Sequence, residues 1–347
     1  MTVAEVRERV RAGGLLTEGS AIVSMVSGGR DSVCLLDVAV ALCGARCVRA
    51  LHVNYGLRAE SDGDELHCRE LCELLGVEIE VVRARRGEDA VGNLHAWARE
   101  LRYEAAIGLA ERLDGQPGGA RDGERSGAQR GSEPFRGRPA GGHATAVIAT
   151  GHTADDQVET ILYRLAASPG RRALLGMGAS EGRLVRPLLG VARQTTADYC
   201  RERGLRWRED AANDSDRYAR ARVRHGLLPV FDAIHPAARA NVLRTAELLR
   251  EETELLDALV AHELAGRSSI LIERLRELPA ALARLIVIRL AEDAAGTFVP
   301  QAGERIGEIL ALGARGGRAE LHVGGLAGAV IERGELRMVA IEPRAQH

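Results

Sequence analysis

The chain has 347 residues, of which 46% are hydrophobic and 28% charged, and its formal net charge is −2. This length favours two domains over one, and the near-neutral charge gives no general signature of polyanion binding. No uncharged apolar run reaches membrane-spanning length, and the early charged residues do not form a signal peptide, so we expect a cytoplasmic protein without a membrane span.

The first half of the chain alternates strand and helix patterns. The predicted strands cover residues 21–26, 47–53, 77–82 and 146–150, and the predicted helices cover residues 33–43, 62–75, 93–113 and 155–167. This alternation indicates an α/β domain, an open parallel sheet with helices on both faces, which we place at residues 1–229. Residues 115–142 are rich in Gly, Arg, Ser and Pro, and predict a disordered insertion.

The pattern changes from about residue 238 onwards. Amphipathic patterns predict helices at residues 238–264, 279–290 and 304–312, and short alternating segments predict antiparallel strands at residues 318–323, 328–331 and 336–341. Residues 230–347 are therefore expected to form a smaller α+β domain.

A glycine turn joins the first predicted strand to the first predicted helix. Its residues are Ser27, Gly28, Gly29, Arg30, Asp31 and Ser32. Glycine permits close approach of a ligand, and the unpaired N–H groups of a helix start bind anions. The turn thus predicts a nucleotide phosphate site, with an ordinary glycine turn as the alternative. It is not a Walker A loop, because the chain contains no lysine.

A second polar stretch, residues 151–160, follows the fourth predicted strand and opens a helix. Ligands of parallel sheets bind at the carboxyl ends of the strands, so this stretch and the glycine turn are expected at one edge. Asp156 and Glu159 are three residues apart and share a helical face. With Asp31 they could hold Mg²⁺ against a triphosphate; helix capping by these acids is the alternative.

A third stretch, residues 210–229, is rich in arginine. Arg220, Arg222 and Arg224 alternate with small or apolar residues, which favours RNA or phosphate contacts over the alternative of a solvated face. The six cysteines form no C-x-x-C pair, and the spacing of four between Cys68 and Cys72 fits one helical face. We expect buried free thiols rather than a metal or redox site.

Together these stretches resemble the tRNA(Ile)-lysidine synthetase family of the pyrophosphate-loop ATPases. The matching blocks are residues 27–32, 52–58, 98–103, 150–160, 174–177, 186–189 and 210–229. The resemblance covers about residues 20–230 and continues more weakly into a part similar to the family's first C-terminal domain; the second such domain of longer members is not expected. The chain departs from the family pattern at Tyr55, near His95 and at Ala221, where the family usually has His, an acid and Asn.

The resemblance implies an ATP-dependent ligase. ATP would adenylate O2 of the wobble cytidine in the isoleucine tRNA with a CAU anticodon, and the amine of free L-lysine would then displace AMP from C2. The implied site residues are as follows: catalytic, Asp31, Arg102, Asp156, Glu159 and Arg220; ATP-binding, the glycine turn with His52, Asn54, Gly151 and His152; Mg²⁺-binding, Asp31 and Asp156; tRNA-binding, Arg220, Arg222 and Arg224.

Other functions stay open at this point. A tRNA 2-thiolation enzyme of the same ATPase family usually carries paired cysteines, which this chain lacks. An amidating synthetase acting on a small metabolite would not need the arginine-rich stretch, and a non-catalytic nucleotide- or RNA-binding protein would not need the three acids. The sequence leaves the oligomeric state open, with a homodimer as one option.

Overall fold

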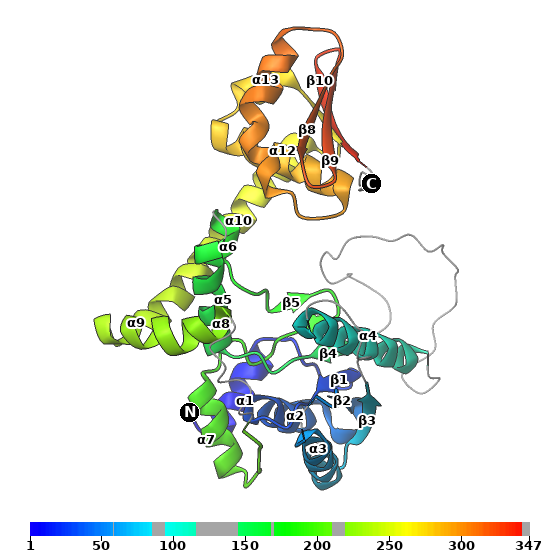
Figure 1. Ribbon diagram of the computed structural model, residues 1–347, viewed down its shortest axis with the longest axis vertical. Helices are drawn as coiled ribbons and strands as arrows, with labels where there is room; N and C mark the ends of the chain where they lie inside the picture. Colours follow the sequence, from blue (N-terminus) through cyan, green and yellow to red (C-terminus); the bar gives the residue numbers. More distant parts are fainter. Residues whose placement is uncertain (58, 85–93, 116–144, 168–169, 210–218, 342–347) are drawn as a thin grey trace. The chain divides into compact units, whose positions relative to one another are not determined.

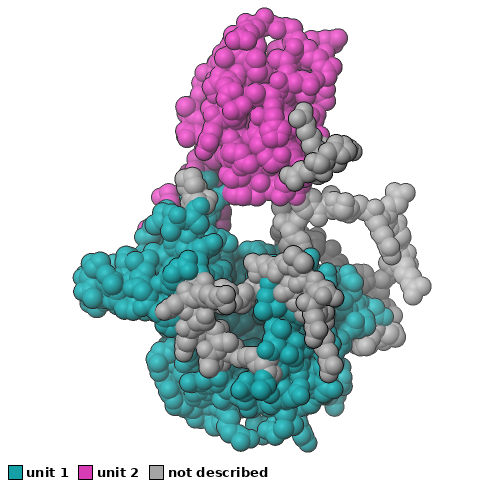
Figure 2. All heavy atoms as spheres, viewed as in Figure 1, with its two compact units in different colours: residues 1–127, 135–247 teal, residues 128–134, 248–347 magenta. Residues whose placement is uncertain are grey.

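The computed structural model describes residues 1–57, 59–84, 94–115, 145–167, 170–209 and 219–341 (Figure 1). The insertion predicted at residues 115–142 lies outside them except for its first residue, and so do residues 210–218 of the arginine-rich stretch. The described chain divides into two compact units, one ending at Glu247 and one starting at Leu248 (Figure 2). The domain boundary at residue 229 stays a prediction. Within these ranges, no helix is both long and apolar enough to cross a membrane.

The first unit contains a six-stranded sheet with the strand order β3-β2-β1-β4-β6-β5. Its strands are β1 (Ile22–Met25), β2 (Val48–Asn54), β3 (Glu78–Arg83), β4 (Val147–Ala149), β5 (Ser180–Glu181) and β6 (Leu184–Val185). Every neighbouring pair is parallel except β5 with β6. The predicted parallel sheet is confirmed, and the two-residue strands β5 and β6 were not predicted because two residues carry no periodicity.

Helices cover both faces of this sheet, as predicted. Ile22 of β1 packs into a core with α1 (Val3–Ala12), α2 (Arg30–Cys43), α3 (Ser61–Leu75) and α7 (Arg193–Glu202), while its neighbour Val23 faces α4 (Leu94–Asp114). Successive strand residues point to opposite faces, so burial on both sides requires apolar residues throughout. Helix α3 ends at Gly76, whose φ of +67° is the left-handed conformation that glycine adopts readily.

Further helices of the first unit follow β4. They are α5 (Ala154–Ala167), α6 (Arg171–Leu174), α8 (Ala219–Arg222), η3 (Val223–Leu227), α9 (Leu228–Ile234) and the start of α10 (Ala238–Leu264). Val158 and Leu162 of α5 share a small core with Leu228. The segment η3 is a π-helix, a rare form that occurs often at functional sites.

The second unit has its own core and an antiparallel sheet of order β7-β10-β9-β8. Its elements after α10 are β7 (Ser269–Leu271), α11 (Ile272–Glu277), α12 (Ala280–Ala295), η4 (Pro300–Arg305), α13 (Ile306–Ala314), β8 (Ala319–Gly324), β9 (Ala327–Glu332) and β10 (Glu335–Ala340). The predicted α+β character is confirmed, with β7 as an additional strand. The six cysteines are free and five are buried, as expected.

Candidate functional site

The glycine turn forms a closed loop at the start of α2. The Ser32 hydroxyl donates to the Gly29 carbonyl at 2.8 Å and accepts from the Ser27 N–H at 3.1 Å. Gly28 has a φ of +85°, which favours glycine at this position. Helix α2 begins at Arg30 without a side-chain cap, so its N-terminal N–H groups are suited to an anionic ligand.

The second motif packs directly against this loop. A Cβ atom placed on Gly151 would lie 3.0 Å from the carbonyl carbon and oxygen of Asp31 and 3.1 Å from the Ser32 nitrogen. No larger residue fits without moving the loop. Because β4 pairs in parallel with β1, residues 151–160 and the glycine turn lie at the same edge of the sheet.

Three carboxylates from these two motifs converge on one guanidinium, that of Arg193 at the start of α7. Its Nη2 lies 2.6 Å from Asp156 Oδ1, its Nη1 lies 3.3 Å from Glu159 Oε1, and its Nε lies 3.6 Å from Asp31 Oδ2. The Arg193 side chain is 16% exposed. Asp31, Asp156 and Glu159 therefore lie together, as the two motifs predicted.

Each carboxylate also has a second set of partners. Asp31 Oδ1 accepts from the Thr196 hydroxyl, and Asp156 Oδ2 accepts from the Thr153 amide at 2.8 Å and hydroxyl at 2.7 Å. Glu159 accepts from Arg224 Nε at 2.7 Å. These donors fix the orientation of the carboxylates independently of Arg193.

The environment shifts the pKa values of Asp31 and Asp156 in opposite directions. Burial raises the pKa of Asp31, and the neighbouring Asp156 charge raises that pKa further. Burial also acts to raise the pKa of Asp156, but Arg193 and the two Thr153 donors outweigh it and hold that pKa below its usual value. Asp156 is therefore the more firmly ionised of the pair.

A cluster of arginines, Arg102, Arg186 and Arg220, surrounds His152 close to the carboxylate of Asp156. Partial burial and the positive charges of Arg186, Arg102 and Arg220 lower the pKa of His152 to about 4, although Asp156 opposes them. The imidazole is therefore neutral at pH 7, and its Nδ1 is 2.8 Å from the Thr150 hydroxyl. Such a cluster is suited to an anionic group of a substrate.

Other residues named in the sequence analysis have partners outside the three carboxylates. His52 is buried, with Nδ1 2.9 Å from the carbonyl of Val26, the residue before the glycine turn. Asn54 donates to Asp62 and Glu65, so its amide is used within the fold. The Tyr55 hydroxyl donates to the Ala98 carbonyl at 2.9 Å, which anchors β2 to α4.

The three arginines of the third stretch have different environments. Arg220 and Arg222 are exposed on α8, where they are free to meet a large ligand. Arg224 instead turns inward, and both its Nε and Nη2 donate to Glu159. The alternation of the sequence did not reveal this difference, because it says nothing of the distant Glu159 that Arg224, in the π-helix η3, contacts.

Three residues of the site were missed by the sequence analysis, namely Arg193, Thr196 and Thr153. Thr153 lies inside the second motif, but a threonine there gave no chemical signal on its own. Arg193 and Thr196 open helix α7, which was not predicted. The available signal was their position shortly after the family-like block at residues 186–189.

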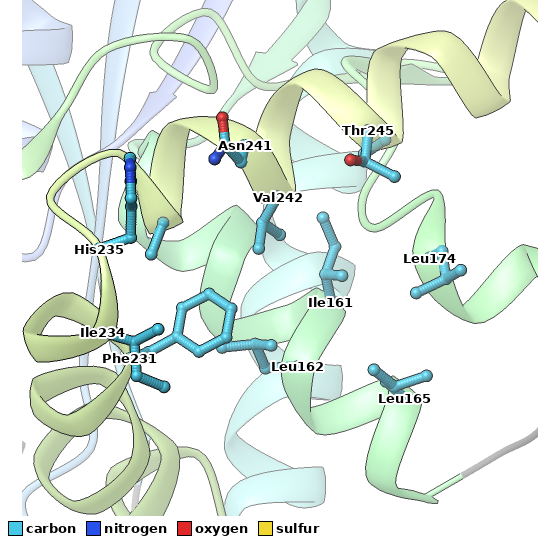
Figure 3. Close-up of a pocket in the computed structure, with 12 residues that line it drawn as sticks. Ile161, Leu162, Leu165, Leu174, Phe231, Ile234, His235, Asn241, Val242 and Thr245 are labelled. Carbon is cyan, nitrogen blue, oxygen red and sulfur yellow. The ribbon is translucent and has the colours of Figure 1, made fainter.

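A separate hollow of about 390 Å³ lies among α5, α6, α9 and α10 (Figure 3). Apolar side chains such as Ile161, Leu162 and Phe231 form most of its wall, and His235 and Asn241 supply polar groups. None of the residues that line it is an acid. The acidic centre around Arg193 is therefore the better candidate for chemistry on a charged substrate.

Comparison with known proteins identifies the family. Residues 4–114 and 138–231 match the PP-loop domain. The tRNA(Ile)-lysidine synthase of Nocardia farcinica is 35% identical over 272 residues, which cover 77% of this chain and 74% of that relative. The chain belongs to the tRNA(Ile)-lysidine synthase family. The resemblance predicted from the motifs is thereby confirmed.

Further members of the tRNA(Ile)-lysidine synthase family are longer than the matched region. The synthase of Pseudomonas syringae pv. tomato is 36% identical over 247 residues, which cover 69% of this chain and 48% of that relative. The synthase of Dehalococcoides mccartyi is 33% identical over 319 residues, which cover 85% of this chain and 61% of that relative. The chain thus spans about half to three fifths of the length of these two relatives.

A solved structure shares the fold. The U34-tRNA thiolase of Methanococcus maripaludis, solved with its [4Fe-4S] cluster, aligns with a TM-score of 0.52 at 16% sequence identity, covering 72% of this chain and 78% of the thiolase. At this identity the likeness concerns the fold alone, and it agrees with the predicted pyrophosphate-loop architecture.

Proposed function

We propose that this chain ligates lysine to C2 of the wobble cytidine in the isoleucine tRNA with a CAU anticodon, using ATP and releasing AMP and pyrophosphate. The observation that carries the proposal is the convergence of Asp31, Asp156 and Glu159 beside the uncapped start of α2. This arrangement offers anion-binding N–H groups and carboxylates side by side, as a metal-bound triphosphate requires. We infer the substrates, tRNA and lysine, from membership of the tRNA(Ile)-lysidine synthase family.

The PP-loop ATP-binding domain accounts for activation of the base. Cytosine O2 attacks the α-phosphorus of ATP, the bond to the β-phosphate oxygen breaks, and pyrophosphate leaves. The N–H groups at the start of α2 hold the departing pyrophosphate, since they lie at the positive end of the helix dipole. Adenylation turns O2 from a poor leaving group into a good one.

Asp31 and Asp156 fit a Mg²⁺ ion that is bound together with ATP. Among the residues described, no group of three or more His, Cys, Asp and Glu side chains can hold a metal by itself. Mg²⁺ ordinarily takes one or two carboxylates and completes its shell with phosphate oxygens and water. The ion would neutralise charge that develops on the phosphates.

The remaining charged residues match the second half of the reaction. Glu159 or Asp156 attracts the cationic lysine and accepts a proton from its ammonium group. The neutral amine then attacks C2, and the bond between C2 and the AMP oxygen breaks. Arg102 and Arg220, grouped around His152, stabilise the adenylate or hold anticodon phosphates. The cytosine must leave its stack to be reached. The exposed Arg222 of the first unit contacts the tRNA, and the second unit binds the tRNA elsewhere.

One incubation tests this proposal. The protein is mixed with ATP, labelled lysine and total tRNA, and the tRNA that gains label is identified. We expect label in the CAU-anticodon isoleucine tRNA alone, with AMP formed only when that tRNA is present. AMP formation without transfer of lysine to any tRNA would contradict the proposal.

Thiolation is less compatible with the cysteines than ligation is. Cys68 and Cys72 lie buried on α3, and Cys34 and Cys200 are buried in the same core. Burial raises the pKa of Cys68 and of Cys72 to about 12, so these thiols stay protonated at neutral pH and are poor nucleophiles.

A further inference from the structure

The guanidinium of Arg193 lies between two aspartates, Asp31 and Asp156. Asp31 uses Oδ1 to accept from Thr196, and Asp156 uses Oδ2 to accept from Thr153. The other oxygen of each carboxylate, Asp31 Oδ2 and Asp156 Oδ1, faces the Arg193 guanidinium at 3.6 and 2.6 Å. Two carboxylates with one oxygen fixed and one oxygen turned to a shared centre form a ligand pair for a bridging cation.

The backbone of Arg193 is anchored by hydrogen bonds that do not involve its guanidinium group. The Arg193 N–H donates to Asp155 Oδ2 at 2.7 Å, and the Arg193 carbonyl accepts from the Thr196 hydroxyl at 2.8 Å. The guanidinium has hydrogen bonds to Asp156 and Glu159. A long side chain of this kind can change partners without disturbing helix α7.

Departure of the guanidinium would leave the carboxylates in place. Glu159 keeps the donors of Arg224, and Asp156 keeps those of Thr153. The three carboxylates and two guanidinium groups carry a net charge of −1, so loss of Arg193 alone would leave −2 in a partly buried site. A divalent cation compensates this loss, and ATP phosphates offer the released guanidinium a new partner.

We propose that Arg193 is an internal substitute for the divalent cation. It occupies the cation position between Asp31 and Asp156 in the free protein and withdraws when Mg²⁺ arrives with ATP. The device prevents the metal from binding strongly without its nucleotide, so that Arg193 acts as a positioning residue that couples metal binding to ATP. This inference rests on the metal site of the proposed function.

The test measures binding of Mn²⁺, a paramagnetic probe for Mg²⁺, in the absence of nucleotide, lysine and tRNA. Electron paramagnetic resonance of free Mn²⁺ gives the dissociation constant for the wild type and for Arg193→Gln. We expect at least tenfold tighter binding by the variant. This figure is conservative. The repulsion between a unit charge and a cation about 4 Å away exceeds the free energy of a tenfold change in affinity, even at an effective dielectric constant of about 20.

Three variants control the interpretation. Arg193→Lys keeps the positive charge and should bind Mn²⁺ within about threefold of the wild type. Arg201→Gln removes an arginine of the same helix that is 57% exposed and pairs with Asp198, and should change nothing. Asp31→Asn combined with Arg193→Gln should lose the gain. Arg193→Met provides a second neutral side chain in case the glutamine variant does not fold.

A non-hydrolysable ATP analogue completes the test, because it should tighten Mn²⁺ binding more in the wild type than in the neutral variants. Unchanged or weaker Mn²⁺ binding in a folded neutral variant would overturn the inference, and so would an equal gain in Arg201→Gln. Since the measurement contains neither lysine nor tRNA, its outcome is independent of whether the chain forms lysidine.

Discussion

Asp156→Asn separates a catalytic role of the acidic centre from a structural one. The substitution keeps the shape of the side chain and removes one negative charge. The variant loses the electrostatic attraction between the Asp156 carboxylate and the Arg193 guanidinium, whose Nη2 lies 2.6 Å from Asp156 Oδ1. A pair of charges centred about 4 Å apart is worth about 4 kcal/mol at an effective dielectric constant of about 20.

Most of this loss is offset within the site. The wild-type centre holds three carboxylates and two guanidinium groups, and the variant holds two of each, so repulsion from Asp31 and Glu159 is relieved. We therefore expect the free energy of unfolding to change by less than about 1 kcal/mol in urea. Formation of AMP, by contrast, should fall by about 10³-fold, which is about 4 kcal/mol of transition-state stabilisation.

The assay follows labelled ATP to AMP in the presence of tRNA and lysine. Asp198→Asn is the matched control, because Asp198 is 50% exposed and pairs only with its helix neighbour Arg201 among the ion pairs described. Turnover of Asp156→Asn within tenfold of the wild type would refute the assignment. A loss of more than about 3 kcal/mol in the free energy of unfolding would show that the charge supports the fold instead.

Three further measurements probe the surroundings of the site. Gly151→Ala should cost about 1–3 kcal/mol of stability and weaken binding of an ATP analogue, because the added Cβ meets the Asp31 backbone at 3.0 Å. The control Gly307→Ala has open space around it and should change neither stability nor binding. Equal behaviour of the two variants in thermal denaturation and nucleotide titration would contradict this prediction. Asp37→Asn should lower the free energy of unfolding by about 3 kcal/mol, since Asp37 is 2% exposed and accepts from two arginines and Tyr199; urea curves that overlay those of the wild type would count against it. Burial lowers the pKa of His152 to about 4 in the folded protein. On acidification the unfolded state therefore takes up a proton at His152 before the folded state does, and the free energy of unfolding should fall as the pH drops from about 6.5 to 4. A His152→Asn variant whose free energy of unfolding depends on pH with the same slope as the wild type would disprove this contribution.

The sequence by itself determined the four parallel strands β1 to β4, the helices α2, α3, α4 and α5, and the two motifs at the edge of the sheet. Local patterns were sufficient for these features, because apolar periodicity and glycine stops act within a few residues. The stop of α3 at Gly76 and the turn at Gly28 are examples in which the backbone conformation itself requires glycine. Asp156 and Glu159 fall on one helical face by spacing alone.

Only the tertiary structure decided which arginines form ion pairs with the three carboxylates. The chain has 47 arginines and no lysine, and nothing local distinguishes Arg193 from the other arginines. Thr196 reaches Asp31 across 165 residues of chain, and Arg224 reaches Glu159 across 65. Buried carboxylates need compensating charge, but the fold alone selects its source, because that choice depends on how distant helices pack.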